Sequence, residues 1–253
     1  MERRVIRARA VRFAYPDHPV LVDLTIDIEE SMTTVIIGAS GIGKSVLLKC
    51  ITGLLRPQSG SITVDGDEVV GADRRAMLAI RKKIGMLFQE GALFDSMTVF
   101  ENVAFPLVYH RSHPPREIES KVHAYLELVG MRDAMQAMPQ ELSGGMKRKV
   151  AIARAMILEP RYLLYDEPTA GLDPASAAIV ESMIKRLQAE RAITSLLVTH
   201  DIELTRYLAD RIALLEEGRI VTLAGRAEAF SESSPVYGHF IEKRERIRQE
   251  NAS

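Results

Sequence analysis

The residues GASGIGKS occupy positions 38–45 and follow the pattern G-x-x-x-x-G-K-[ST]. Glycines in such a loop let the backbone curl, so that successive N–H groups point at one phosphate group. The apolar run at 33–38 predicts a buried parallel strand before the loop. An apolar helical pattern follows over about 44–54, and we expect Arg56-Pro57 to end that helix. Strand, glycine loop and helix together predict a nucleoside-triphosphate site.

Each position of this loop has an expected task at a triphosphate. Lys44 would neutralise the β- and γ-phosphates, and the Ser45 hydroxyl would ligate Mg²⁺. The helix N-terminus adds its positive dipole end at the same place. ATP and Mg²⁺ are therefore the expected ligands. The other expected nucleotide-contacting residues of this loop are Gly38, Ser40, Gly41, Gly43 and Val46.

The stretch YLLYDE (162–167) predicts a buried strand that ends in two adjacent carboxylates. Strand side chains alternate, so the two carboxylates are expected to point in different directions. Asp166 would hold the Mg²⁺ shell through water, and Glu167 would act as general base toward the attacking water. Loss of such a base typically lowers the rate by about 10²–10⁴.

Three further residues suit the same site. Gln89 follows the apolar run 84–88 and is expected to ligate Mg²⁺ or water, and His200 ends the run 193–199 and suits a hydrogen bond to the γ-phosphate. Tyr15 suits stacking on adenine. Each also has an ordinary interpretation as a polar strand end, a loop histidine or a packed aromatic. We give that ordinary interpretation to the remaining histidines: His18, His110, His113, His123 and His239.

A second glycine loop, LSGGM (142–146), precedes the helical pattern 147–156. This helix N-terminus also suits phosphate. A second complete nucleotide site would need its own phosphate-binding lysine and its own Mg²⁺ ligands, and the nearby sequence offers neither. We therefore expect Ser143, Gly144 and Gly145 to complete the nucleotide site of a second copy of the chain. Two nucleotides would be sandwiched head to tail, and ATP binding and hydrolysis would close and reopen the dimer.

The order of the expected elements predicts an α/β core with a helical insertion. Strand patterns flank a turn at 16–19 and recur up to residue 88, and βα alternation returns from 161 to 223. Between them the block 98–158 is helical, with expected breaks at Pro106, at Pro114-Pro115 and at Pro139.

Composition narrows the function classes. The chain has 33 Lys+Arg against 34 Asp+Glu, 6% aromatic residues and no Trp, which argues against a nucleic-acid partner. The single cysteine, Cys50, lies on an apolar helical pattern and is expected to be a buried, inert thiol. No secretory signal and no run of 18 apolar residues is present, so we expect a soluble, intracellular chain, and if it works at a membrane, another chain must supply the span.

In this order, GASGIGKS, Gln89, LSGGM, YDEP, GLDP and His200 resemble the nucleotide-binding domain of an ABC ATPase from about residue 3 to 230. The resemblance implies a P-loop NTPase core (1–90 and 159–230) whose mixed sheet has an antiparallel β edge. It also implies an α-helical subdomain over about 91–158 and a separate tail, 231–253. Asp173, in AGLDP, would contact the facing subunit of a homodimer. The homodimer would power a separate permease.

The stretch EGALFDSMTVFENVAFPL (90–107) closely resembles the MlaF-like ATPases of Mla/Mce-type phospholipid transport systems. This resemblance implies ATP-driven movement of phospholipid between the inner membrane and a lipid-binding protein with a Mce domain. The ATPase would sit on the cytoplasmic face of the inner membrane, bound to a permease dimer and to a small regulatory subunit in some systems. Its apolar residues suit either a packed subdomain or the permease contact: Phe94, Val99, Phe100 and Phe105.

Other functions remain as alternatives. An importer ATPase for amino acids or metal chelates shares every catalytic motif and differs in its solute-binding partner. A non-transport ABC protein acting on ribosomes or DNA would generally carry two such domains or a long inserted arm. A catalytically inactive scaffold would not be expected to keep Lys44, Glu167 and His200 together.

Overall fold

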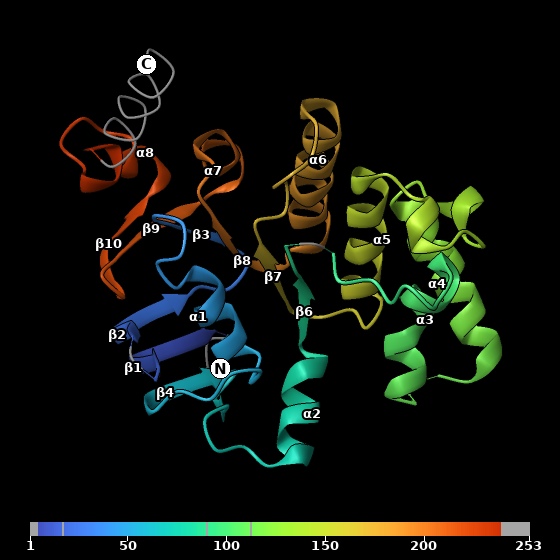
Figure 1. The fold of residues 1–253 in the computed structure, drawn as a ribbon, viewed down its shortest axis with the longest axis horizontal. Coiled ribbons are helices and arrows are strands. Elements are labelled where there is room, and N and C mark those ends of the chain that lie inside the picture. The colour runs from blue at the N-terminus through green and yellow to red at the C-terminus, as the bar shows by residue number, and fades with distance from the viewer. Residues whose placement is uncertain (1–4, 17, 90, 112, 239–253) are drawn as a thin grey trace. The chain divides into compact units, whose positions relative to one another are not determined.

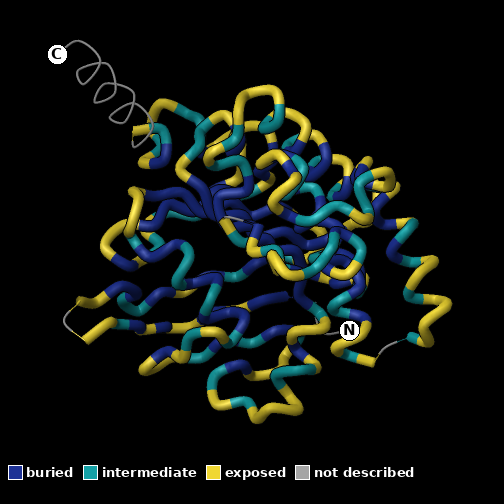
Figure 2. The backbone as a smooth tube through the Cα atoms, turned by 45° about the vertical axis from the view of Figure 1, so that its right-hand side comes forward, coloured by how far each residue is buried: buried dark blue, intermediate teal, exposed yellow. Residues whose placement is uncertain are grey.

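The computed structural model describes residues 5–16, 18–89, 91–111 and 113–238, and the chain divides into two compact units. We call residues 1–73 and 196–253 the phosphate-loop unit and residues 74–195 the helical unit (Figure 1). Most strand residues are buried, and exposed residues gather in loops and on outer helix faces (Figure 2). His239 and the rest of the expected tail beyond residue 238 lie outside the described residues.

An antiparallel sheet forms one part of the phosphate-loop unit. Its strand order is β2-β1-β4-β5. The alternation expected at its second strand is confirmed, because Leu24, Ile26 and Ile28 are buried whereas Thr25 is exposed. The strands are β1 (Ile6–Tyr15), β2 (His18–Ile28), β4 (Ser59–Val64) and β5 (Asp67–Glu68).

The second sheet of this unit carries the glycine loop. Strand β3 (Thr33–Ile37) pairs in parallel with β9 (Arg211–Glu216), and β10 (Arg219–Gly225) pairs antiparallel with β9. All five β3 residues are buried, as expected for a strand covered on both faces. The unit therefore combines parallel and antiparallel pairing, which confirms the expected mixed α/β fold. The remaining elements are α1 (Lys44–Ile51), α7 (Ile202–Leu208), α8 (Arg226–Ala229) and most of β8 (Thr194–Thr199).

Helix α1 ends earlier than the sequence pattern indicated. Arg56-Pro57 does not end it, because the helix stops at Ile51 and Gly53 then adopts a left-handed φ of 64°. The Leu54 N–H donates to the Lys49 carbonyl at 2.8 Å, and the Gly53 N–H donates to the Cys50 carbonyl at 3.1 Å. These two bonds are the Schellman arrangement that a glycine after the C-cap permits.

The helical unit contains a parallel pair of strands, and helices pack against the first of them. Strand β6 (Ile84–Leu87) pairs with β7 (Tyr162–Asp166), and α5 (Gly144–Met156) packs against β6, α3, α4 and α6. The other helices are α2 (Arg74–Lys82), α3 (Val99–Tyr109), α4 (Pro115–Leu128) and α6 (Pro174–Arg191), with short 3₁₀ turns at Arg132–Ala134 and Pro139–Glu141.

The expected break at Pro106 is wrong, because α3 continues through Pro106 to Tyr109. A proline inside a helix removes one backbone donor, and here the buried Val103 and Leu107 on either side keep the helix packed. The start of α3 is secured by a capping box. The Thr98 side chain accepts from the Glu101 N–H at 3.2 Å, and the Glu101 carboxylate accepts from the Thr98 N–H at 2.8 Å.

Candidate nucleotide site

The glycine loop between β3 and α1 depends on two of its glycines for close packing. A Cβ on Gly38 would lie 2.6 Å from the Leu215 carbonyl oxygen, and one on Gly43 would lie 2.7 Å from a Val20 methyl group. Gly43 also has a φ of 112°, which L side chains rarely adopt. Only glycine therefore allows the chain to turn this tightly from the strand into the helix.

Lys44 is held inside the loop. Its Nζ donates to the carbonyl oxygens of Gly38 at 2.9 Å and Ala39 at 3.0 Å, and only 6% of the residue is exposed. Gly43 is the N-cap of α1 and makes no side-chain capping hydrogen bond. Of the other expected contacts, Ser40 and Gly41 are exposed, and Ser45 and Val46 are half-buried.

Two more expected site residues belong to the same unit. Tyr15 is the last residue of β1, is 48% exposed and contacts Phe13 edge to face, with ring centroids 5.2 Å apart. His200 follows β8 directly and is exposed, and Asp201 after it caps α7 by accepting from the Leu204 N–H at 3.0 Å.

The two carboxylates at the end of β7 belong to the helical unit. Asp166 is 4% exposed and Glu167 is 9% exposed. The expectation that strand alternation separates them is wrong, because β7 ends at Asp166 and Glu167 has a left-handed φ of 45°. A tight turn, in which the Ala170 N–H donates to the Glu167 carbonyl at 3.2 Å, sets its direction instead. Such a conformation costs a non-glycine residue roughly 1–2 kcal/mol and is found preferentially at functional sites.

Gln89 follows β6 and is exposed, as a residue that meets a ligand should be. It shares a cavity of about 320 Å³ with the first turn of α5 and with the loop after Glu167. The lining residues are Gln89, Gly144, Lys147, Arg148, Ala170, Gly171 and Leu172. Within the helical unit, the structure thus brings Gln89 close to the second glycine loop.

The glycine pair of LSGGM has a packing role that sequence reasoning missed. A Cβ on Gly145 would lie 2.9 Å from the Ser176 Oγ, and one on Gly144 would lie 3.1 Å from a Leu172 methyl group. Ser143 is exposed and caps α5 by accepting from the Met146 N–H at 3.3 Å. The pair therefore permits close approach of α5 to the start of α6, whether or not a second chain is present.

Asp173 is exposed and caps α6. Its carboxylate accepts from the Ser176 N–H at 3.0 Å. Hydrogen bonds from Ser176 hold the pKa of Asp173 below its usual range: the larger effect comes from the Ser176 side chain and the smaller from the Ser176 backbone N–H. The residue is thus an exposed, ionised group at the start of α6.

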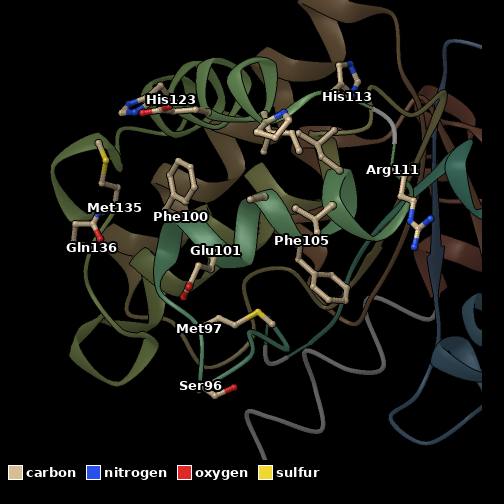
Figure 3. A pocket seen from close by; sticks show the side chains of 16 residues that line it. Ser96, Met97, Phe100, Glu101, Phe105, Arg111, His113, His123, Met135 and Gln136 are labelled. Carbon is tan, nitrogen blue, oxygen red and sulfur yellow. The ribbon is translucent and has the colours of Figure 1, made fainter.

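A groove of about 1120 Å³ lies in the helical unit, between α3, α4 and the segment before α3 (Figure 3). Phe100 and Phe105 extend from α3 beside it, whereas Val99 is completely buried in the core. Phe94 is 41% exposed and lies 4.8 Å from Phe105 between ring centroids. The charged and polar lining residues are Ser96, Glu101, Arg111, His113, Glu119, His123 and Gln136.

The structure also places residues outside the site. Cys50 is fully buried, as expected, and burial raises the pKa of its thiol to about 12. Burial, together with the charge of Lys82, lowers the pKa of His110. Among the described residues, no helix is both long and apolar enough to cross a membrane.

A glycine loop with a buried lysine, placed between a parallel strand and a helix, defines a phosphate-loop nucleotide-binding protein. The family model described as ABC transporter matches residues 21–170, and the chain belongs to this family.

Curated relatives span several transport systems. The MlaF ATP-binding protein of an intermembrane phospholipid transport system from Haemophilus influenzae is 39% identical over 93% of this chain and 89% of its own length. A probable ribonucleotide transport ATP-binding protein, mkl, from Mycobacterium leprae is 36% identical over 94% of this chain and 69% of its own. The methionine import ATP-binding protein MetN from Haemophilus influenzae is 41% identical over 83% of this chain and 61% of its own.

Solved structures agree with this assignment. The ATP-binding cassette MJ0796, in a dimeric post-hydrolysis state with ADP and Pi, superposes with a TM-score of 0.79 at 28% identity over 87% of this chain and 98% of its own. CbiO1 from Clostridium perfringens superposes with a TM-score of 0.81 at 30% identity over 95% of this chain and all of its own. This protein is thus an ATP-binding and ATP-hydrolysing subunit of an ABC transporter, and its resemblance to the MlaF-like ATPases is confirmed.

Proposed function

We propose that this subunit energises phospholipid transport between membranes through a separate permease. The observation that carries the proposal is the likeness to the MlaF protein, which extends over nearly the whole of both chains at 39% identity. The ATPase would work as a homodimer on a permease dimer at the cytoplasmic face of the inner membrane. A Mce-domain lipid-binding protein would be its further partner, and a small regulatory subunit would join in some systems.

At the nucleotide, the phosphate loop would hold the triphosphate and Lys44 would turn from its two carbonyl acceptors toward the β- and γ-phosphates. Ser45, Gln89 and Asp166 offer a hydroxyl, an amide oxygen and a carboxylate, which are the hard oxygen donors that Mg²⁺ prefers. The metal, when bound, would neutralise phosphate charge. Glu167 would take the proton of the attacking water, and His200 would donate a hydrogen bond to the γ-phosphate.

A second copy would complete each site. Ser143, Gly144 and Gly145 open a helix of 13 residues whose first turn is exposed at Ser143 and Gly144, which suits the γ-phosphate of a nucleotide on the facing subunit. Asp173 would contact that subunit. In each chain, residues 1–90 and 159–230 would form the ATPase core, and about 91–158 would form the subdomain that contacts the permease through the groove of Figure 3.

Glu167→Gln tests the catalytic assignment. We expect ATP turnover to fall by about 10²–10⁴ while ATP binding is retained, because the amide cannot accept the proton of water but keeps the side-chain shape. Glu159→Gln is the matched control, since Glu159 lies in the same unit, has a left-handed φ of 54°, is exposed and forms an ion pair with Lys121 at 2.8 Å. Near wild-type turnover by Glu167→Gln would show that the base lies elsewhere.

The transported substrate needs a separate experiment. Native mass spectrometry of the tagged chain, purified in detergent from its own membranes, is expected to show two copies with a permease, a Mce-domain protein and phospholipid. A second candidate, an amino-acid importer, is favoured by the 41% identity to MetN. Recovery of a permease without lipid, together with methionine-stimulated ATPase activity, would favour that importer. Recovery of no membrane protein would contradict both candidates.

A further inference from the structure

Arg148 joins two loops of the helical unit that carry candidate site residues. It lies on α5, five positions after Ser143, and only 5% of it is exposed. Its Nη1 donates to the Phe88 carbonyl at 2.9 Å, and its Nη2 donates to the Ala170 carbonyl at 3.1 Å. Phe88 immediately precedes Gln89, and Ala170 lies between Glu167 and Asp173.

Both carbonyls belong to tight turns. The Phe88 carbonyl also accepts from the Gly91 N–H at 2.8 Å, which closes the turn around Gln89. The Ala170 N–H donates to the Glu167 carbonyl at 3.2 Å, which closes the turn after the carboxylates. Movement of either turn therefore changes the position of an acceptor of Arg148.

The guanidinium suits this bridging task because of its shape. Its planar fork presents several N–H donors in fixed directions, so one side chain reaches two acceptors on different loops. The Gln89 turn and the 167–173 segment lie beside the same cavity of about 320 Å³, because Gln89 and Leu172 both line it. A lysine at this position has one compact ammonium group and is not shaped to hold both carbonyls in the same geometry.

We propose that Arg148 is a positioning residue that makes the Gln89 turn and the 167–173 segment move as one. A change at Gln89 on ATP binding would then reach Asp173 at the start of α6, and would also reach the LSGGM helix, on which Arg148 itself lies. The proposal rests on the proposed function, in which Gln89 and Glu167 act on ATP and Asp173 contacts the facing subunit.

Backbone hydrogen exchange of the full chain without nucleotide tests the link directly. The Gly91 amide reports on the first turn, and the Ala170 and Leu172 amides report on the second. We expect Arg148→Met to speed exchange at both turns by about 10-fold, because a charged donor is lost from each. Arg154→Met is the matched control on the same helix, since Arg154 donates to the Gly91 and Ala92 carbonyls at 2.8 and 2.9 Å and should affect only the first turn.

Unchanged exchange at Ala170 and Leu172 in Arg148→Met would overturn the proposal. Equal effects of Arg148→Met and Arg154→Met at the second turn would also overturn it, because they would indicate general loosening of the unit. Arg148→Lys is expected to protect at most one turn. These exchange outcomes do not require ATP turnover, so they decide the role of Arg148 even if the proposed function fails.

Steady-state ATPase measurements then connect the link to catalysis. Arg148→Met is expected to lower kcat by about 10-fold and to leave KM for ATP within about two-fold, because the phosphate loop and Lys44 are untouched. Arg186→Met, which removes a donor to the Leu128 carbonyl at 2.8 Å, controls for the loss of an arginine elsewhere in the unit. Unchanged kcat, or a change in KM alone, would contradict the positioning role, whereas an inactive wild-type chain would contradict the proposed function.

Discussion

Asn102 anchors the segment that leads from the Gln89 turn into α3. Its Oδ1 accepts from the Phe94 N–H at 2.8 Å, and its Nδ2 donates to the carbonyls of Phe94, Met97 and Thr98 at 3.0–3.1 Å. After Asn102→Ala, the Phe94 carbonyl keeps its bond from the Met97 N–H, and the Thr98 carbonyl keeps its bond from the Asn102 N–H. The loss therefore falls on the Phe94 N–H and the Met97 carbonyl, which are bonded to the Asn102 side chain.

Leaving such groups without a partner costs about 1–3 kcal/mol each when they are buried, and less where water reaches them. We therefore expect Asn102→Ala to lower the free energy of unfolding by about 2–4 kcal/mol. For a chain of this size, this corresponds to a fall in Tm of about 5–15 °C. Thermal unfolding followed by circular dichroism measures the change.

The neighbouring variant Glu101→Ala is the matched control for Asn102→Ala. It removes the capping-box carboxylate, which accepts from the Thr98 N–H at 2.8 Å and from the Thr98 hydroxyl at 3.1 Å, and should lower stability by about 1 kcal/mol. If Asn102→Ala lowered Tm no more than Glu101→Ala, the hydrogen bonds to the 94–98 segment would not stabilise the fold as argued.

Two further predictions concern the phosphate-loop unit. A thiol pKa of about 12 instead of 9.0 leaves about 1,000-fold less Cys50 thiolate at pH 8. Maleimide labelling of Cys50 should therefore be at least about 1,000-fold slower in the native than in the unfolded protein. The labelling rate of the native protein should still rise with pH above 9, and a plateau near pH 9 would contradict this prediction. Gly38→Ala should lower the free energy of unfolding by about 2–3 kcal/mol, because the new Cβ would meet the Leu215 carbonyl. Gly41→Ala is its control: a Cβ there has nothing within 4 Å, so the variant should lose only about 1 kcal/mol, through its φ of 79°. Equal losses of the two variants in urea unfolding would refute the packing argument.

The sequence allowed the fold to be predicted where a periodic pattern met a strong local signal. The strand before the glycine loop, the loop itself and the helix after it were all found, because apolar runs and glycines act locally. Errors arose where tertiary packing outweighed a local rule. Buried neighbours carry α3 through Pro106, and Gly53 ends α1 before the proline that seemed to end it.

The site could be predicted only in part for a related reason. Motif residues such as Lys44 and Glu167 are recognisable because their chemistry is specific, and both are buried in the structure. The bridge made by Arg148 depends on contacts between segments far apart in the chain. No local pattern signals such contacts, so they become visible only in three dimensions.

The close approach of Gly145 to Ser176 bears on how this family can be interpreted from sequences alone. A descendant that had lost ATP turnover would still have little room for a side chain at this position, since a methyl group would lie 2.9 Å from the Ser176 Oγ and 3.0 Å from the Ser176 Cβ, and Ser176 would have to shift. Retention of the glycine would then reflect folding rather than catalysis. Loss of turnover in members of this family should accordingly be sought at residues proposed to act on ATP, such as Glu167.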